Sequence, residues 1–520
     1  MTSLIPLSLL APLILLAGAG LAAAQPGRRP GRLPMLAEGA ALAALVLAAA
    51  GAAQLALSGP ATFGFGSGAL LIAFRLDAVS ATMALLVAFI GWIVTRYSRT
   101  YLDGAEREGA FHGLILATLA AVLLLVQAGS LAVLVAAFVA VGAAMRRLLL
   151  WFPERAEARR AAAKFALVWG AGDAALIVAA AFLWSAWGTA DIALLAEAAS
   201  GGLPLAAKIA VALLALAAAL KTASFPLHGW LTEVMEAPTP VSALLHAGVV
   251  NAGGFLLIRL ADLVQASPGA MAALAMIGGF TALFGATVML TQSAAKTAFA
   301  WSTVSQMGFL LLQCGLGLWA LALLHVVAHS LYKAHAFLSA GGAVKAATET
   351  RRPGPVAAPG LRDVARAFAL ALALYAAVAS AFWLLIGPKS AQALALGAIL
   401  IFGVAYLVAQ GLAAAAPRAL ARKTAQASLA AALAYFGFHA VSGALWGPHL
   451  PEPPVPGALE WALIVLALAS FGLVAVAQSL FPRWAHHPAA AGLRVHVANG
   501  FYLNAVLDRL IGGFDAVKPR

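Results

Sequence analysis

Long apolar runs recur along nearly the whole chain and are separated by short polar stretches. Each run is about 20 residues long, which is the length of helix needed to cross the hydrocarbon core of a bilayer. The runs centre near residues 12, 46, 88, 119, 140, 175, 215, 251, 280, 306, 330, 375, 401, 436 and 468. None alternates apolar and polar positions over about 10 residues, as barrel strands do. The pattern predicts an all-α polytopic membrane protein with about 14–15 transmembrane helices, at least one of them broken.

The composition agrees with this fold class and excludes several kinds of site. The chain is 63% hydrophobic and only 10% charged, whereas about a quarter of the residues in a soluble domain are charged. Cys314 is the single cysteine, which excludes a disulfide framework, a cysteine-rich zinc site and a cysteine-ligated iron–sulfur cluster. No glycine-rich nucleotide motif is present. We therefore predict no cofactor in this chain and no nucleic-acid partner.

The net charge of +13 is concentrated in loops that follow alternate apolar runs. These loops contain Arg28, Arg29, Arg32, Arg96, Arg99, Arg107, Arg146, Arg147, Arg155, Arg159, Arg160, Lys345, Arg351, Arg352, Arg362, Arg418, Arg422, Lys423, Arg483 and Arg494. The other loops hold little beyond Arg75, Lys208, Arg259 and Lys389. The positive-inside rule predicts a multi-pass protein of a bacterial inner membrane with its N-terminus outside and its C-terminus in the cytoplasm. No basic residue precedes the first run, so we expect a retained helix rather than a cleaved signal peptide.

Composition shifts divide the chain into five predicted regions. A central region carries nearly all the ionisable residues inside apolar runs, and a Pro-rich loop separates it from a blander Ala/Leu-rich part. The regions are N-terminal helices 1–110, the conducting core 111–344, a cytoplasmic loop 345–363, C-terminal transmembrane helices 364–482 and a cytoplasmic tail 483–520.

Lys221 is the last residue of one apolar run. A charged side chain at the bilayer centre costs about 2.5–3.5 kcal/mol. Pro226 follows closely, so the helix should end or break just past the lysine, and a break is tolerated where it lines a cavity. The alternative is that Lys221 extends to the interface. Four ionisable residues follow in one stretch and favour a functional role. They are His228, Glu233, Glu236 and His246.

A row of protonatable residues occupies one later run. His325, His329 and Lys333 are spaced by four, so they share one helix face in a stripe about 12 Å long, while His335 points elsewhere. The spacing of the two histidines also suits zinc, but no third Cys, Asp or Glu ligand lies nearby. Histidine titrates near neutral pH, so the row favours proton transfer over metal binding.

Asp173 and Lys296 complete the set of candidate residues. Asp173 lies in an apolar run and could pair with a lysine on a neighbouring helix. A buried lysine stays charged beside a carboxylate and tends to lose its proton when that partner is removed, which is a physical way to move protons along a row. Lys296 begins an apolar run, where an interfacial lysine is an equally good interpretation. His246, taken alone, could equally be a packing residue.

The stretch from His228 to His246, HGWLTEVMEAPTPVSALLH, resembles the large antiporter-like subunits of respiratory complex I and of Mrp cation/proton antiporters. The likeness continues through Lys296–Gly308 and through the row from His325 to Lys333, and it covers about the middle half of the chain. The resemblance implies an antiporter-like bundle in which the proton pathway comprises Lys221, His246, Lys296, His325, His329 and Lys333. We group with them, as supporting residues, Asp173, His228, Glu233, Glu236 and Pro226.

The sequence departs from this family at three places. Phe138-Val139 replaces a Trp-Glu pair whose glutamate partners the family's lysine, and Gly170 replaces the arginine of an Arg-x-Gly-Asp motif. The C-terminal third has no clear counterpart of a further ionisable residue, and Lys389 lies near a helix end. These departures look closest to the DabB branch, as do the residues 232–237, 251–254 and 495–502. DabB is the membrane subunit of DAB inorganic-carbon transporters.

This resemblance implies a partner protein and a function. The partner would be a large peripheral zinc protein on the cytoplasmic side, DabA, which is similar to β-carbonic anhydrases. The chain would feed a gradient of protons or sodium into one-way conversion of CO2 to bicarbonate, and would be a transport subunit rather than an enzyme. Two alternatives stay open: a proton-pumping subunit of a complex I, hydrogenase or Mrp assembly, and a non-conducting membrane anchor.

Overall fold

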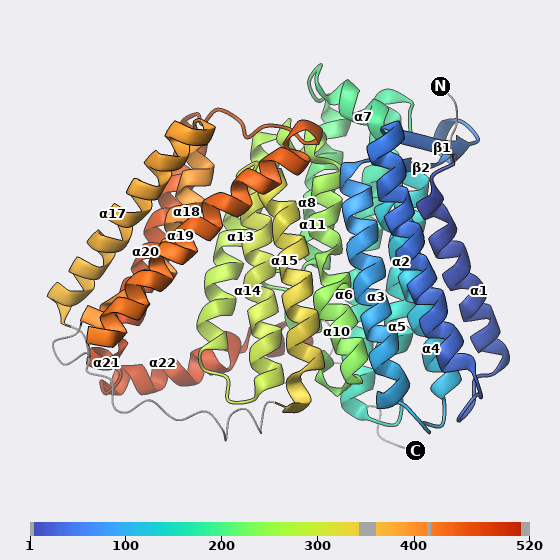
Figure 1. The fold of residues 1–520 in the computed structure, drawn as a ribbon, viewed down its shortest axis with the longest axis horizontal. Coiled ribbons are helices and arrows are strands. Elements are labelled where there is room, and N and C mark those ends of the chain that lie inside the picture. Colours follow the sequence, from blue (N-terminus) through green and yellow to red (C-terminus); the bar gives the residue numbers. More distant parts are fainter. Residues whose placement is uncertain (1–4, 343–359, 413–417, 511–520) are drawn as a thin grey trace.

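The computed structural model describes residues 5–342, 360–412 and 418–510, and these residues form a bundle of long helices (Figure 1). Each of the fifteen predicted centres falls in a helix, or at the junction of α10 and α11, so the predicted all-α membrane fold is confirmed. The long helices are α1 (Leu10–Ala24), α2 (Leu33–Ser58), α3 (Ala78–Tyr101), α4 (Glu108–Val126), α5 (Leu131–Leu149), α6 (Ala156–Trp187), α8 (Leu205–Lys221), α10 (Thr239–Ala247), α11 (Ala252–Arg259), α13 (Pro268–Met289), α14 (Ala295–Gly315), α15 (Trp319–Leu338), α17 (Leu361–Ile386), α18 (Ala391–Leu412), α19 (Arg418–Trp446) and α20 (Ala458–Ser479).

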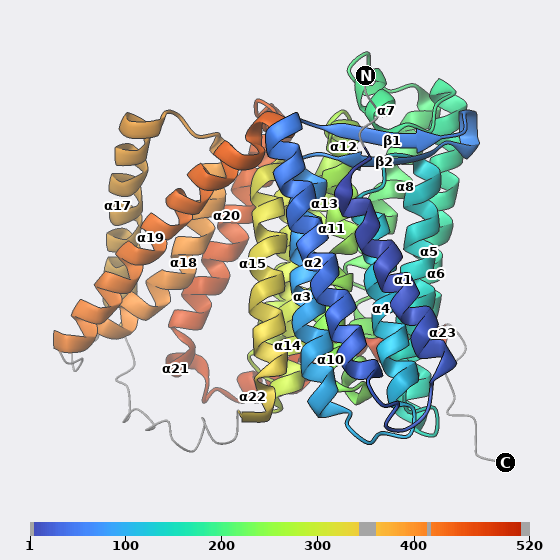
Figure 2. The same ribbon diagram turned by 45° about the vertical axis from the view of Figure 1, so that its right-hand side comes forward.

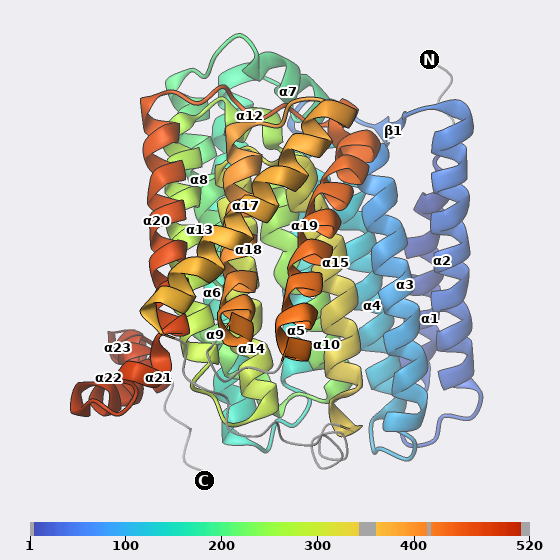
Figure 3. The ribbon, with the colours of Figure 1, turned by 60° about the vertical axis from the view of Figure 1, so that its left-hand side comes forward.

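Twelve helical segments of the described chain are long and apolar enough to span a membrane. α8 and α14, which carry candidate site residues, are not among them, because α8 has 17 residues and α14 begins with a polar stretch. α1 to α15 form the main body, and α17 to α20 form a second group that leans against α13 and α15 (Figures 1 and 3). The helices that carry the candidate site residues therefore lie in the middle of the body.

A short β-hairpin covers one end of the bundle, near α7 (Ile192–Ala199) (Figure 2). β1 (Ala61–Phe65) and β2 (Ile72–Leu76) pair antiparallel. The sequence did not reveal these strands, because segments of only five residues carry too weak an alternation to be recognised. Asp77 then caps α3, and its carboxylate accepts from the Ser80 N–H at 2.8 Å.

Two interruptions shape the centre of the body. α8 ends at Lys221, as the nearby proline predicted, and the chain then passes through the short α9 (Gly229–Thr232) into α10. A second interruption, which the sequence did not reveal, separates α10 from α11 at residues 248–251, where Asn251 donates its side-chain amide to the Ala247 carbonyl at 3.0 Å. Broken helices free backbone groups at membrane depth only where other protein groups can satisfy them.

The basic loops share one end of the bundle. The turns between α1 and α2, α3 and α4, and α5 and α6 lie together there, opposite the hairpin (Figure 1). Three residues of the predicted basic set, Lys345, Arg351 and Arg352, lie outside the described residues. The C-terminal segment crosses this basic end through α21 (Phe481–Trp484), α22 (Pro488–Ala498) and α23 (Leu503–Leu510) (Figure 1). The charge asymmetry read from the sequence is therefore present between the two ends.

Candidate functional site

Lys221 lies fully buried between α6 and α8 beside Asp173. Its ammonium nitrogen Nζ is 2.6 Å from the Asp173 Oδ1 atom, so the carboxylate partner expected from the sequence is in place. The same nitrogen lies 4.0 Å from the centroid of the Trp169 ring and 4.8 Å from that of Phe138, which adds cation–π contacts. At Gly172, an added Cβ would come within 3.2 Å of the Lys221 Cε atom. The glycine therefore leaves room for the lysine stem.

Val139, the residue that stands where the related proteins have a glutamate, does not face Lys221. Phe138 is fully buried and points its ring at Lys221, whereas Val139, which stands where the family has glutamate, is 43% exposed. Consecutive residues on a helix point about 100° apart, so only one of the two can face the lysine. Asp173 of α6 is the carboxylate that compensates Lys221 in this chain.

His246 of α10 contacts α14 through its ring and α15 through its backbone carbonyl. Its Nδ1 atom lies 3.1 Å from the Thr303 hydroxyl oxygen, and that hydroxyl donates to the Phe299 carbonyl at 2.9 Å. The Thr303 oxygen must then accept from His246, which places the imidazole proton on Nδ1. The Nε2 atom has no hydrogen-bond partner among the described residues. The His246 ring also stacks on that of Phe337, with centroids 4.4 Å apart.

Lys333 and His329 connect to His246 from α15. The Lys333 ammonium donates to the Phe299 carbonyl at 3.0 Å, which is the carbonyl that Thr303 also uses. The His329 Nε2 atom lies 3.1 Å from the His246 carbonyl oxygen, which can only accept, so Nε2 carries the proton. Polar contacts therefore join the three ionisable residues through one hydroxyl and two backbone carbonyls.

His325 extends the row toward the hairpin end. Its ring centroid lies 5.9 Å from that of His329, and its Nδ1 atom lies 2.8 Å from the Gln313 amide oxygen on α14. His335 is exposed on another face of α15, as the spacing predicted. In the described part of the chain, Lys333 has no carboxylate within ion-pair distance, in contrast to Lys221. The two buried lysines therefore differ in how their charges are compensated.

Thr303 is the residue most suited to testing this connection. We predict that Thr303→Val lowers the free energy of unfolding by about 1 kcal/mol and slows ion transport severalfold, because valine keeps the volume but removes the hydroxyl between His246 and the Phe299 carbonyl. Thermal unfolding and proton uptake by reconstituted vesicles are the measurements. Thr303→Ser, which keeps the hydroxyl, is the matched control. Equal transport by the valine and serine variants would contradict the prediction.

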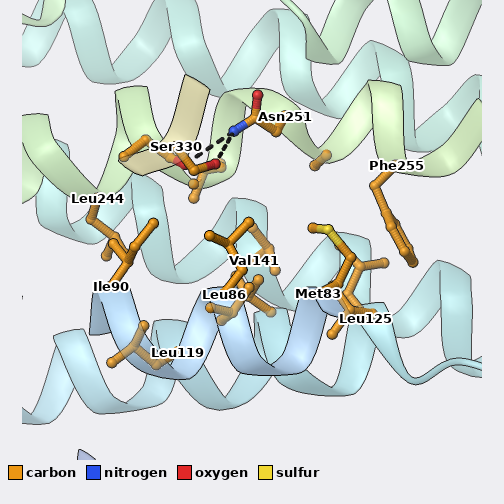
Figure 4. Close-up of a pocket in the computed structure, with 17 residues that line it drawn as sticks. Met83, Leu86, Ile90, Leu119, Leu125, Val141, Leu244, Asn251, Phe255 and Ser330 are labelled. Carbon is orange, nitrogen blue, oxygen red and sulfur yellow. Dashed lines mark hydrogen bonds between the residues drawn. The ribbon is translucent and has the colours of Figure 1, made fainter. Parts of the chain in front are cut away.

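An apolar cavity of about 40 Å³ lies beside the histidine row, between α3, α4, α5, the α10–α11 interruption and α15. Figure 4 shows Asn251 and Ser330 at its edge, where the asparagine amide donates to the Ser330 hydroxyl at 3.0 Å. Side chains such as Met83, Leu119 and Phe255 line the rest. A buried water needs two to four polar partners. Asn251 and Ser330 are the polar residues among those that line it, so most of this cavity offers a water no partner.

His228 and Lys296 lie outside this network. His228 is buried, with its ring centroid 5.3 Å from that of Phe284 and 5.0 Å from that of Trp301. Lys296 lies in the first turn of α14 at the basic end, and it is partly exposed. Its position fits the interfacial interpretation that the sequence left open. Within residues 5–342, 360–412 and 418–510, no three His, Cys, Asp or Glu residues gather as a metal-ligand set.

The two glutamates of the motif pair with basic residues of α6 and the turn before it. Glu236 lies 2.8 Å from Arg155, and Glu233 lies 2.6 Å from the Lys164 ammonium. Lys164 is only 5% exposed and is also 2.6 Å from Asp508 of α23. The sequence did not predict Lys164 or Asp508 as site residues. A lysine next to a short alanine run near the start of α6 was the available signal, but its partners lie far away in the chain.

Another buried ion pair lies at the hairpin end. Arg259, the last residue of α11, places Nη1 2.6 Å from Asp77 and donates through Nη2 to the Val126 carbonyl at 3.1 Å. Arg75 of β2 lies 3.0 Å from the same carboxylate. Two of the few basic residues at this end are therefore structural partners of Asp77, which leaves the end still poorer in free positive charge.

Comparison with known proteins identifies the family. Residues 128–408, just over half of the chain, match the family described as NADH:quinone oxidoreductase/Mrp antiporter, transmembrane region. Residues 63–112 match the N-terminal region of NADH-ubiquinone oxidoreductase (complex I) chain 5. In fold, the chain is similar to a chain of the Mrp complex from Dietzia sp. DQ12-45-1b, with a TM-score of 0.62 and 24% identity over 96% of this chain and 59% of that one.

Among curated proteins, the chain is 41% identical over 305 residues to the probable inorganic carbon transporter subunit DabB2 of Halothiobacillus neapolitanus, covering 58% of this chain and 55% of the relative. It is 40% identical to the probable subunit DabB of Hydrogenovibrio crunogenus over 55% of each chain. It is 32% identical to NADH-quinone oxidoreductase subunit L of Mycobacterium tuberculosis over 53% of this chain and 44% of the relative. The match thus spans about half the length of these relatives. On the family match, this chain belongs to the NADH:quinone oxidoreductase/Mrp antiporter family of membrane proteins.

Proposed function

We propose that this chain is the proton-conducting membrane subunit of an energy-coupled inorganic-carbon uptake complex. The observation that carries the proposal is the set of buried ionisable residues in the body of the bundle, namely the Lys221–Asp173 ion pair of α8 and α6 and the contacts that join His246, His329 and Lys333. Ionisable residues inside membrane helices are costly and mark ion pathways. The similarity to subunits named as inorganic carbon transporters supports the choice of cargo.

The two lysines suggest how such a line would work. Lys221 holds its charge while Asp173 is 2.6 Å away, and it would release a proton when the two helices move apart or when the carboxylate is itself protonated. The histidines joined to Lys333 can accept a proton on one ring nitrogen and give one up from the other. His246, protonated at Nδ1 and with its Nε2 unpartnered among the described residues, is arranged to receive one.

The charge asymmetry supports an orientation and a partner. The end with the basic loops would face the cytoplasm of a bacterium, with the N-terminus outside and the C-terminus inside. A peripheral zinc subunit similar to carbonic anhydrases would dock on that end and carry the catalytic zinc. This chain would then supply no reaction chemistry of its own, and its part would be to couple the proton gradient to the partner.

Growth of a carbonic-anhydrase-deficient bacterium in ordinary air tests the proposal. We expect rescue when the chain is expressed with a genomic neighbour that encodes the zinc subunit, and loss of rescue with Lys221→Ala or His329→Ala. Lys208→Ala and His335→Ala are matched controls, because they replace exposed residues of the same helices, α8 and α15. Copurification of the two subunits shows whether each variant still assembles.

A second candidate rests on the matches to respiratory subunits, such as chain 5 of NADH-ubiquinone oxidoreductase from Metridium senile at 33% identity. In this second candidate function, the chain is a proton-pumping subunit of a complex I, hydrogenase or Mrp assembly. No rescue by a stably assembled wild-type pair would favour this candidate, and sodium and proton transport in vesicles would then be measured. Rescue that survives both Lys221→Ala and His329→Ala would favour a non-conducting anchor.

A further inference from the structure

A surface cavity of about 690 Å³ opens at the basic end of the bundle, away from the ionisable row. It lies where the α1–α2 turn and the first turn of α2 meet the last turns of α3, a region that Figure 2 shows at the near side of the molecule. Its size is within the range of about 300–1,000 Å³ that is usual for small-molecule sites. Three arginines line it: Arg32, Arg96 and Arg99.

Positive charge exceeds negative charge in this cavity. Arg96 and Arg99 share a single carboxylate, that of Glu38, and the Nε atom of Arg96 is as far as 3.9 Å from it. Arg32 is exposed and has no carboxylate within ion-pair distance among the described residues.

The two acidic residues in the cavity wall already have hydrogen-bond or ion-pair partners. The Glu108 carboxylate accepts the backbone N–H groups of Arg29 and Gly104, at 3.3 and 3.0 Å. Asp103 lies 3.6 Å from the Arg29 guanidinium. Arginine is the residue best suited to binding an anion that offers several oxygens, such as a phosphate group.

The cavity lies at the boundary between the apolar bundle surface and the basic loops. Immediately beyond Arg32, Met35 and Leu36 of α2 are 59% and 57% exposed, so an apolar surface begins at the cavity rim. On α3, the Arg96 guanidinium lies over the Trp92 ring, and Tyr97 stacks on Tyr101. Tryptophan and tyrosine are typical of the headgroup level of a bilayer. A ligand with a phosphate and attached acyl chains fits both the arginines of the cavity and the apolar surface at its rim.

We propose that this cavity binds the phosphate of an anionic phospholipid headgroup, with Arg32, Arg96 and Arg99 around the phosphate and the acyl chains along the exposed side chains of α2. Basic pockets between membrane helices on the cytoplasmic side are suited to such headgroups. The inference does not depend on proton conduction, so either can fail alone.

Binding of phosphatidylglycerol to the full chain in detergent micelles tests the inference, with phosphatidylcholine as the neutral lipid. We expect saturable binding of phosphatidylglycerol only, and binding roughly thirtyfold weaker in the double variant Arg32→Gln/Arg96→Gln. The matched control is Arg362→Gln/Arg366→Gln, which removes two exposed charges from the first turns of α17 at the same end. It should bind phosphatidylglycerol as the wild type does.

A second variant keeps all the arginines. Thr100 is an exposed residue of the cavity wall, so Thr100→Glu adds a repelling charge with little effect on folding and should also weaken binding. Unchanged binding by both variants, or equal binding of the two lipids, would overturn the inference. Inorganic phosphate that displaces phosphatidylglycerol at millimolar concentration would assign the cavity to free phosphate instead, which also overturns it.

Discussion

Replacing Asp173 by Ala should lower the free energy of unfolding by about 3–5 kcal/mol and abolish ion transport. Breaking a buried ion pair leaves an uncompensated charge, and that penalty is of this size. Lys221 has no other carboxylate within ion-pair distance in the described chain and is surrounded by the rings of Trp169 and Phe138. Thermal unfolding in detergent and proton uptake by reconstituted vesicles measure the two effects.

The double variant Lys221→Met/Asp173→Leu separates stability from function. Apolar replacement of both partners of a buried pair is often neutral or stabilising, so stability should return close to that of the wild type while transport stays absent. Glu157→Ala is the matched control, because it removes an exposed carboxylate from the first turn of the same helix. It should change neither property. Transport by the double variant would show that the ion pair is only structural.

The sequence predicted those features that depend on neighbours within one helix. The lengths of the apolar runs gave the membrane helices, since span length is set by bilayer thickness. The i, i+4 spacing placed His325 and His329 on one face, where the ring centroids are 5.9 Å apart. Pro226 predicted the end of α8, because proline restricts the backbone conformation of the residue before it and cannot donate a helical hydrogen bond. Each of these rules is local.

The features that the sequence did not predict join distant segments. Thr303 connects His246 to the Phe299 carbonyl only because α10 and α14 pack together, and a threonine in an apolar helix gives no signal of that. The same is true of Asn251, whose partner Ser330 lies on α15. The sequence predicted that Asp173 could pair with a lysine. It did not identify Lys221 as that lysine, because the pairing depends on the contact between α6 and α8. No spacing rule reaches across such distances.

The contact of the tail with α6 is the longest-range example and has consequences for the site. Lys164 of α6 is held by Glu233, in the stretch that follows Lys221, and by Asn504 and Asp508 of α23. Asp173 lies nine residues further along α6, so the tail is fixed to the helix that carries the carboxylate partner of Lys221. A change in the tail could therefore alter the position of α6.

Lys164→Met should release α23 from the basic end and lower the free energy of unfolding by about 3 kcal/mol. The Lys164 ammonium nitrogen is 2.6 Å from both the Glu233 and the Asp508 carboxylates. Without it, the ion-pair partner of these two carboxylates in the described chain would be Arg160, whose side chain is 45% exposed, and Glu233 would keep the Asn504 amide. Removing one partner of a largely buried charge cluster costs several kcal/mol. Hydrogen exchange at residues 503–510 should rise by at least tenfold.

A glycine offers the same test without changing any charge. A Cβ added at Gly229 would lie 1.8 Å from the Asn504 Oδ1 atom, so Gly229→Ala must displace the Asn504 side chain of α23 from its contacts with Lys164 and Glu233. Gly492→Ala in α22, where an added Cβ meets no atom within 4 Å, is the matched control and should leave exchange unchanged. If Lys164→Met and Gly229→Ala both release the tail and both slow transport, docking of α23 sets the position of α6. Release without any effect on transport would instead make the tail a separate structural element, because Asp173 would then hold Lys221 without its help.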